Sequence, residues 1–275
     1  MTTRHSTRSP GTSTRGRGPL TFTAFNRWLE EDWGFAYQGR IFAAPYLSLA
    51  DVDWAIEELE WALEKGARAV VMRPAAPVTA LGPRPPADPV FDPFWARVNE
   101  SGVTVVAHAG DSGYSSQGYA RDGFSASFEG SGRPSIKFFA MERAIYDFLA
   151  SLVFDELFVR FPNVRIASVE NGSEFLPDLF RKLHSVGRKL PGFFRDDPVE
   201  LFKQNVWVNP FWEDDADELV ELRGADRVIF GSDRPQIEGM PRPLDYVAEL
   251  EELDATAGRR VLRDNARELK TLRPA

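Results

Sequence analysis

The stretch VTVVAHAG, residues 103–110, indicates the architecture of the chain. Its first five positions are apolar except for one threonine, and they show no alternation of apolar and polar residues. Such an unbroken run is typical of a strand in a parallel sheet that is buried on both faces. The run ends at His108, where a polar side chain emerges before a glycine. The stretch therefore predicts a buried parallel strand with His108 at its carboxyl end.

Short apolar segments of the same kind recur along the chain and alternate with helical patterns. The predicted strands are 40–47, 67–74, 103–110, 163–172, 205–212 and 226–233. The predicted helices are 25–35, 48–66, 91–102, 138–162, 173–190, 214–224, 243–253 and 257–270. This alternation predicts an α/β fold with a helix-covered parallel sheet. Six strands suffice for a doubly wound sheet, whereas a closed barrel needs eight.

Composition limits the classes of function. The chain has 275 residues, a net charge of -8 and no cysteine. The acidic balance argues against nucleic acid as the main partner, and the lack of cysteine excludes disulfides and thiolate metal sites. No apolar run is long enough to span a membrane, and no signal-peptide core is present. The sequence predicts a cytoplasmic protein that acts on a small molecule.

Two polar segments stand apart from this pattern. Residues 1–19 are basic and poor in apolar side chains, which predicts a disordered leader before one domain at 20–275. A transit peptide or a nucleic-acid-binding tail is the alternative for the leader. Residues 111–135 form a loop rich in glycine and serine, for which a lid over the site and a plain insertion remain equal alternatives.

Polar side chains follow each of the six predicted strands. All strand carboxyl ends of a parallel sheet open on one face, so these residues are expected to converge there. They are Tyr46, Arg73, His108, Glu170 with Asn171, Asn209 and Asp233. His108, Glu170 and Asp233 could bind a divalent metal or form an acid–base set. The structural alternatives are a hydrogen-bonded histidine, an aspartate cap and an ion pair between Glu170 and Arg73.

Four motifs in order resemble the amidohydrolase-related family, the metal-dependent TIM-barrel hydrolases that include decarboxylases of the aminocarboxymuconate-semialdehyde type. The motifs are VTVVAHAGDSGY, RIASVENGSEFLPDLFRKL, VIFGSDRPQIEGMPRP and DNARELK, and the resemblance covers residues 25–272. It implies a (β/α)8 barrel whose third to eighth strands are the six visible ones. The barrel is therefore expected to be incomplete.

The resemblance also implies roles for the strand-exit residues. His108 matches a metal-binding histidine, and Asp233 matches the last metal ligand, which also takes the proton of the attacking water. Glu170 stands where the family often has a histidine and becomes the third ligand and a catalytic residue. Zinc is the expected metal. The chain departs from the family because it has no His-x-His pair, and because Gln236 replaces a frequent histidine.

The substrate contacts and the activity follow from these assignments. Arg73 is predicted to bind a substrate carboxylate, because a guanidinium forms two parallel hydrogen bonds with one. Asn171 and Asn209 are predicted to orient the substrate. The predicted function is a metal-dependent hydrolase of a small carboxylated or aromatic molecule. The alternatives are a non-oxidative decarboxylase, or a degenerate barrel that binds a small acid or is completed by a partner. The missing strands predict a homo-oligomer.

Overall fold

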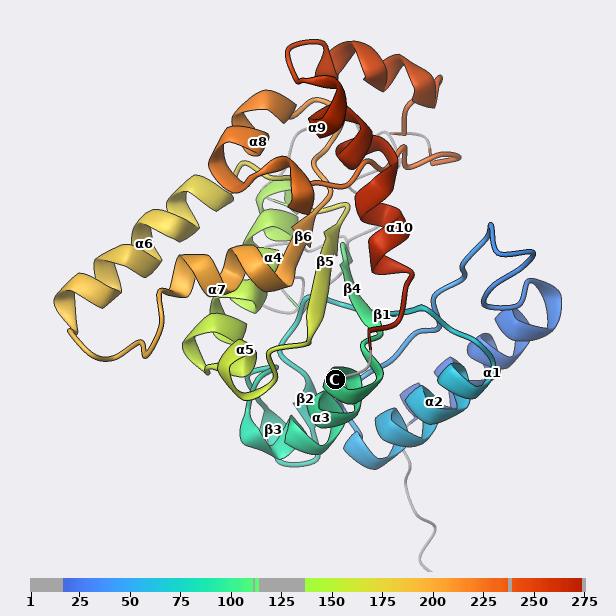
Figure 1. Cartoon of the computed structure of the whole chain (residues 1–275). Helices are drawn as coiled ribbons and strands as arrows, with labels where there is room; N and C mark the ends of the chain where they lie inside the picture. The colour runs from blue at the N-terminus through green and yellow to red at the C-terminus, as the bar shows by residue number, and fades with distance from the viewer. Residues whose placement is uncertain (1–16, 111, 114–136, 237–238, 274–275) are drawn as a thin grey trace, which may run out of the picture.

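The structure is a computed structural model that describes residues 17–110, 112–113, 137–236 and 239–273 (Figure 1). Residues 1–16 of the predicted leader lie outside this part. So does the predicted lid, apart from residues 112–113. The predicted leader and helix α1 overlap slightly, because α1 begins at Arg17.

A four-stranded parallel sheet forms the centre of the chain. Its order is β1 (Ala69–Met72), β4 (Thr104–His108), β5 (Arg165–Val169) and β6 (Val206–Val208). Single parallel bridges extend it at both edges, Tyr46 to Val71 on one side and Val208 to Val228 on the other. The six predicted strand segments therefore lie side by side in sequence order, which confirms the parallel α/β fold. The two outermost segments pair through these single bridges alone within the described residues.

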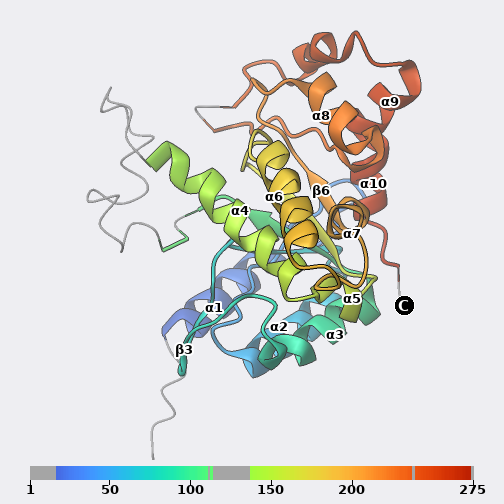
Figure 2. The same cartoon turned by 90° about the vertical axis from the view of Figure 1, so that its left-hand side faces the viewer.

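Helices surround the sheet. They are α1 (Arg17–Asp32), α2 (Val52–Glu64), α3 (Asp92–Ser101), α4 (Lys137–Phe154), α5 (Leu157–Arg160), α6 (Leu176–Lys189), α7 (Pro198–Asn205), α8 (Ala216–Arg223), α9 (Ala255–Arg259) and α10 (Asn265–Leu269). Figure 2 shows α4, α6 and α7 together on one side of the sheet. No helix in the described ranges is both long enough and apolar enough to cross a membrane.

Several local elements differ from the sequence predictions. The helix predicted at 138–162 is interrupted at Glu156, whose left-handed φ of 52° separates α4 from α5. The segment predicted as helix at 243–253 forms a 3-10 helix over Pro243–Leu250. Helix α7 and a small hairpin of β2 (Val78–Thr79) and β3 (Gly82–Pro83) were also not predicted. Asp197 caps α7 by accepting hydrogen bonds from two backbone N–H groups, a signal that the sequence does contain.

The two faces of the sheet pack differently. Side chains alternate along a strand, so Val105 and Ala107 join the large core under the surrounding helices. The other face carries a small apolar cluster of Ala167, Trp207 and Ile229, to which α10 adds Leu269. We call this second side the inner face. His108 belongs to it, because it lies two residues beyond Val106, which packs against the small cluster.

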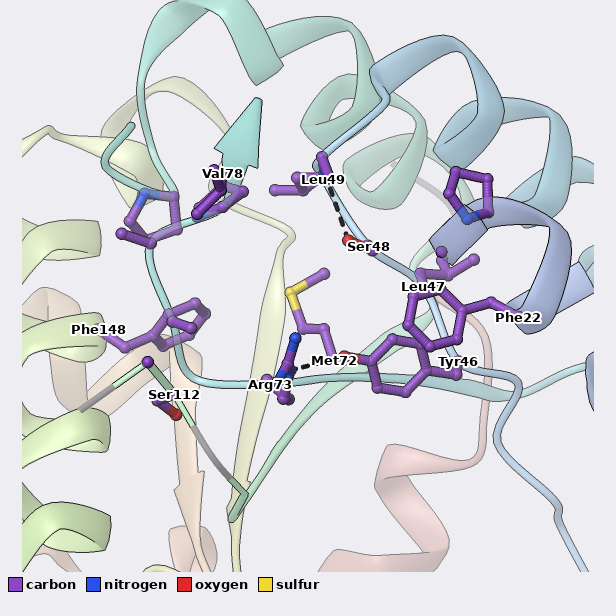
Figure 3. A pocket seen from close by; sticks show the side chains of 18 residues that line it. Phe22, Tyr46, Leu47, Ser48, Leu49, Met72, Arg73, Val78, Ser112 and Phe148 are labelled. Carbon is purple, nitrogen blue, oxygen red and sulfur yellow. Dashed lines mark hydrogen bonds between the residues drawn. The ribbon is translucent and has the colours of Figure 1, made fainter. Parts of the chain in front are cut away.

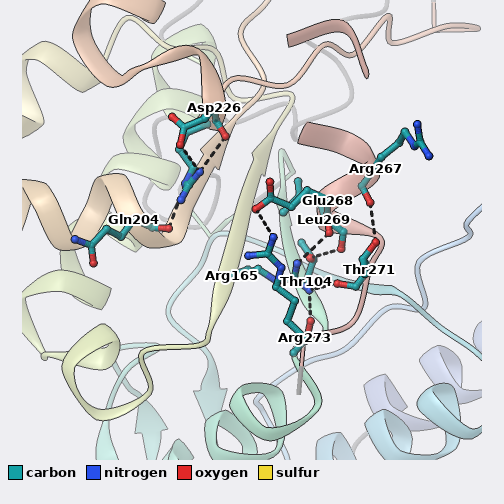
Figure 4. A network of polar contacts seen from close by, with 11 residues as sticks. Thr104, Arg165, Gln204, Asp226, Arg267, Glu268, Leu269, Thr271 and Arg273 are labelled. Carbon is teal, nitrogen blue, oxygen red and sulfur yellow. Dashed lines mark hydrogen bonds and ion pairs between the residues drawn. The ribbon is translucent and has the colours of Figure 1, made fainter. Parts of the chain in front are cut away.

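Polar contacts at the amino-terminal end of the strands fix the end of the chain (Figure 4). Arg165 is 4% exposed and donates to the carbonyl oxygens of Glu268 at 3.1 Å, Thr271 at 2.9 Å and Gly102. The Thr104 hydroxyl donates to the Leu269 carbonyl oxygen at 2.7 Å. Burial lowers the pKa of Arg165 to about 10. These contacts tie α10 to the strand starts.

Helix α1 covers the first edge of the sheet. The buried Asn26 side chain donates to the Tyr46 carbonyl oxygen at 2.9 Å and accepts from the Tyr46 N–H at 2.8 Å. It therefore satisfies both backbone groups that a further strand would otherwise pair with. Glu58 of α2 holds Asn26 at 3.0 Å and Arg27 through two bonds of 2.7 and 3.0 Å. The edge at Tyr46 is thus closed by side chains.

Candidate active site

His108 and Glu170 form an ion pair at the exits of neighbouring strands. His108 Nε2 lies 2.8 Å from Glu170 Oε2, and His108 Nδ1 lies 2.9 Å from the Ala109 carbonyl oxygen. Both ring nitrogens therefore face acceptors, which favours the doubly protonated imidazolium. The hydrogen bond that His108 donates to Glu170 raises the pKa of His108, against the lowering effect of burial, and the charge of Asp233 raises it further. The structure brings together the predicted His108 and Glu170.

The backbone at both predicted acids is in the left-handed region. The φ of Glu170 is 59° and that of Asp233 is 54°. Strand alternation would place Glu170 with Ser168 on the outer face, and the left-handed turn instead directs its carboxylate to His108. Residues other than glycine in this conformation cost of order 1–3 kcal/mol and concentrate at functional sites. This energetic cost falls on Glu170 and Asp233, the two carboxylates predicted to be catalytic.

The turn after the last strand segment fixes Asp233. The Met240 N–H donates to the Ser232 carbonyl oxygen and the Gln236 N–H donates to that of Asp233, both at 2.9 Å. Gly239 is packed so tightly that a Cβ atom would lie 2.5 Å from the Asp233 carbonyl oxygen. This turn therefore needs glycine at 239 to hold Asp233 near His108.

Arg73 stands beside His108 on the neighbouring strand. It follows β1 by one residue, as His108 follows Ala107, and Met72 is paired with Ala107 in the parallel register. Arg73 Nε donates to the Tyr46 hydroxyl at 3.2 Å. Its stem packs at the exit of β4, since a Cβ on Gly110 would lie 3.5 Å from Arg73 Cδ. The predicted carboxylate-binding side chain and the predicted acid–base pair thus occupy one rim.

An apolar hollow of about 450 Å³ lies on the inner face between α1 and the strand exits, and we call it the inner hollow. Its lining residues are Phe25, Leu29, Ala43, Ala44, Tyr46, Val71, Met72, Arg73, His108 and Ala109. The volume is within the usual range of small-molecule sites. The contribution of α1 to this hollow was not predicted from the sequence. The signal was present in the four-residue spacing of Phe25 and Leu29, which places both on one face of a helix.

The two asparagines predicted to orient the substrate donate hydrogen bonds to carbonyl oxygens of the protein itself. Asn171 is fully buried and donates to the carbonyl oxygens of Ala107 at 2.9 Å and Val169 at 2.8 Å. Asn209 is 8% exposed and donates to the carbonyl oxygens of Pro210 and Ile229. Both side chains therefore hold strand ends together. Their contact with substrate stays a prediction.

The donor types at the rim suit a divalent metal, but their arrangement does not. His108 offers nitrogen, and Glu170 and Asp233 offer oxygen, as zinc sites require. In the described ranges, however, no three His, Asp or Glu side chains are grouped closely enough to hold an ion. The two nearest donors, His108 and Glu170, bond to each other. The described residues alone therefore do not fit a closed metal site.

Comparison with known proteins places this site in a family. The family model described as "Amidohydrolase" matches residues 16–269. The chain belongs to the amidohydrolase family. This confirms the resemblance seen in the sequence, and with it the TIM-barrel type of fold. None of the curated proteins compared with the chain is a significant match.

Solved structures agree with the family assignment. An amidohydrolase from Mycobacterium avium subsp. paratuberculosis K-10 is 38% identical with a TM-score of 0.85, and the match covers 93% of this chain and 64% of that one. The chain thus spans less than two thirds of that relative. A 2,6-dihydroxybenzoate decarboxylase from Rhizobium shares the fold at 20% identity, with a TM-score of 0.73 and coverage of 92% and 78%.

A third structure shows a metal in this fold. It is a dihydroxybenzoic acid decarboxylase from Polaromonas sp. JS666 with bound manganese and an inhibitor, 2-nitroresorcinol. It is 18% identical with a TM-score of 0.69, and the match covers 92% of this chain and 76% of that one. The family and these structural neighbours are enzymes, some with a divalent metal and some with small molecules bound.

Proposed function

We propose that the chain hydrolyses an amide or ester bond in a small carboxylated molecule, with His108 and the strand-exit acids as the acid–base set. The observation that carries this proposal is the 2.8 Å contact between His108 and Glu170 beside the inner hollow. An imidazolium next to carboxylates provides an acid and a base within one site. Arg73 adds a cation for the substrate carboxylate on the neighbouring strand.

Each side chain has a distinct task in this proposal. The substrate carbonyl oxygen replaces Glu170 as the acceptor of the His108 Nε2–H, which polarises the carbonyl. Water attacks the carbonyl carbon while Asp233 accepts the proton that the water loses. The bond to the leaving amine or alkoxide then breaks, and His108 gives its proton to that group. Glu170 keeps His108 charged between turnovers.

The test is hydrolysis of a panel of carboxylated amides and esters in water enriched in oxygen-18. We expect one labelled oxygen in the acid product. His108→Gln and Asp233→Asn should each lower kcat/KM by about 10²–10⁴-fold, the usual contribution of a positioned acid or base. His184→Gln is the matched control, because His184 is 48% exposed and lies 3.8 Å from Asp197. An equal loss in all three variants would contradict the assignment.

Metal binding is tested separately. The sequence predicts zinc held by His108, Asp233 and Glu170. Metal content per chain should be measured beside His108→Ala and Asp233→Ala. About one equivalent that is lost in both variants would support the predicted ligand set. The same preparations test the predicted homo-oligomer by ultracentrifugation, and localisation in cells tests the predicted cytoplasmic placement.

Non-oxidative decarboxylation is the second candidate. The neighbouring positions of Arg73 and His108 favour it, because a carboxylate on Arg73 would bring its attached carbon near the imidazolium. Breaking that C–C bond would release carbon dioxide, and His108 would protonate the carbon. Labelled carbon dioxide from a carbon-13 carboxylate, with no oxygen-18 in the product, would decide for this reaction.

A further inference from the structure

The turn between α6 and α7 projects from the molecule away from the sheet. Figure 1 shows it at the outer edge, beyond the helices that cover the sheet, and Figure 2 looks onto that edge. It comprises the stretch RKLPGFFR, residues 188–195, which we call the tip. Leu190 is 54% exposed and Phe193 is 46% exposed. A projecting turn that exposes two large apolar side chains indicates a contact surface.

The backbone of the tip is held in one conformation. The Phe193 N–H donates to the Leu190 carbonyl oxygen at 3.0 Å, and Gly192 between them has a φ of 82°. A type II turn requires this left-handed value at its third residue and favours the proline that precedes it. The ring of Phe194 lies 4.9 Å from that of Phe193 and 5.5 Å from that of Phe154, at the end of α4. A contact surface fixed in this way loses little conformational entropy on binding.

Basic side chains flank the two apolar ones. Arg188, Lys189 and Arg195 are all exposed, and within the described residues no ion pair joins any of the three to a carboxylate. Asp196 follows them and lowers the local net charge by one. The whole chain has a net charge of -8, so this concentration of bases is a local exception. Such a charge asymmetry attracts an anionic partner.

Shape and charge together favour one kind of anionic partner. Near the strand exits the apolar surface is concave, as in the cavity of about 470 Å³ between Tyr46, Met72 and Phe148 (Figure 3), which suits a small molecule. The tip projects instead. A symmetric contact with the tip of a second copy would bring like charges together. The surface of a lipid bilayer accepts apolar side chains at its acyl boundary and bases at its phosphates.

We propose that the tip binds the surface of membranes that contain anionic phospholipids. Leu190 and Phe193 enter the boundary between headgroups and acyl chains, and Arg188, Lys189 and Arg195 lie at the level of the lipid phosphates. Helix α6 itself stays outside the bilayer, because its buried apolar side belongs to the large core. The association is peripheral and reversible, and it does not depend on the reaction at the rim.

The first test removes charge. Cosedimentation of the whole chain is measured with phosphatidylcholine vesicles that contain phosphatidylserine, and with phosphatidylcholine vesicles alone. We expect binding to the anionic vesicles that weakens as salt screens the exposed charges. The double variant Arg188→Gln and Lys189→Gln should weaken it about 25-fold, since each base near an anionic surface contributes about fivefold. The matched double variant Arg259→Gln and Arg260→Gln, at an exposed pair of bases in another part of the chain, should keep the binding.

The second test removes apolar surface. Leu190→Ser should weaken vesicle binding about tenfold or more, because a leucine that enters the acyl boundary leaves water. Leu244→Ser is the matched control, since Leu244 is 84% exposed and lies on the 3-10 helix Pro243–Leu250. Circular dichroism of both variants checks that the fold is kept. An equal loss of binding in the two would overturn the proposal.

A third test reports insertion directly. The chain has no cysteine, so Leu190→Cys or Leu244→Cys can carry one polarity-sensitive dye at a single position. Anionic vesicles should shift the emission of the dye to the blue at position 190 and leave it unchanged at position 244. An unchanged dye at position 190, no binding to anionic vesicles, or equal binding to phosphatidylcholine alone would overturn the proposal. So would self-association of the chain that Leu190→Ser abolishes in ultracentrifugation, because the tip would then be an interface between copies. Turnover without vesicle binding would defeat this proposal and leave the hydrolase proposal standing.

Discussion

At the amino-terminal end of the sheet, Arg165 is 4% exposed and gives its hydrogen bonds to main-chain carbonyl oxygens of three residues in two separate segments. At the carboxyl end, His108 and Glu170 are 44% and 23% exposed and bond to each other beside an apolar hollow. A buried charge that donates its hydrogen bonds to the backbone stabilises one arrangement of the chain. A partly exposed pair, with Glu170 in left-handed backbone, remains available to a ligand. The difference separates residues that hold the fold from residues that can do chemistry.

The largest effect is expected at the amino-terminal end. Arg165→Met should lower the free energy of unfolding by about 2–4 kcal/mol, because buried carbonyl oxygens lose their donor. Urea unfolding followed by circular dichroism measures this. Arg188→Met, at an exposed position near the end of α6, should change stability by less than about 0.5 kcal/mol. Equal stability of the two variants would remove the distinction between the ends.

The two sheet edges give the next largest effect. At one edge, Asn26 forms hydrogen bonds with the backbone N–H and carbonyl groups of Tyr46. At the other edge, Asn265 donates to the carbonyl oxygens of Ala225 and Val228, both at 2.7 Å. Asn26→Ala and Asn265→Ala should each lower the free energy of unfolding by about 1–3 kcal/mol, the cost of unsatisfied buried groups. Thermal and urea unfolding measure it.

A kinetic measurement then distinguishes the edges. Only Asn26→Ala should also raise the KM for the carboxylated substrate, because Asn26 holds the backbone of Tyr46, which contacts Arg73. Gln204→Ala, at an exposed position of α7, is the control for both measurements. A rise in KM of the same size in Asn265→Ala would show that the effect reports general destabilisation.

The sequence predicted the strands and the rim, because both follow from local pattern. The unbroken run at 103–107 and the polar residue after each strand are visible without tertiary structure. The left-handed backbone at Glu170 and Asp233 is not visible, because neither residue type demands it. Nor could the pattern show that Asn171 and Asn209 donate hydrogen bonds to main-chain carbonyl oxygens. Those contacts depend on distances between strands, which hydrophobic periodicity does not encode.

The smallest effect concerns the pH dependence of the rim itself. Glu170 raises the pKa of His108 in the folded chain, so the pair stabilises the fold fully below the ordinary histidine pKa. That contribution is lost as the pH rises through the raised folded pKa.

Glu170→Gln should lower the His108 pKa towards its ordinary value. It should therefore narrow the pH range over which the pair stabilises the fold. NMR titration of the imidazole C–H signals measures it, with the signal of the exposed His184 as internal reference. Because His108 is almost half exposed, solvent screening keeps the stability change small. An unchanged His108 pKa in Glu170→Gln would show that the pair does not hold the proton at the rim, and the acid role of His108 would lose its physical basis.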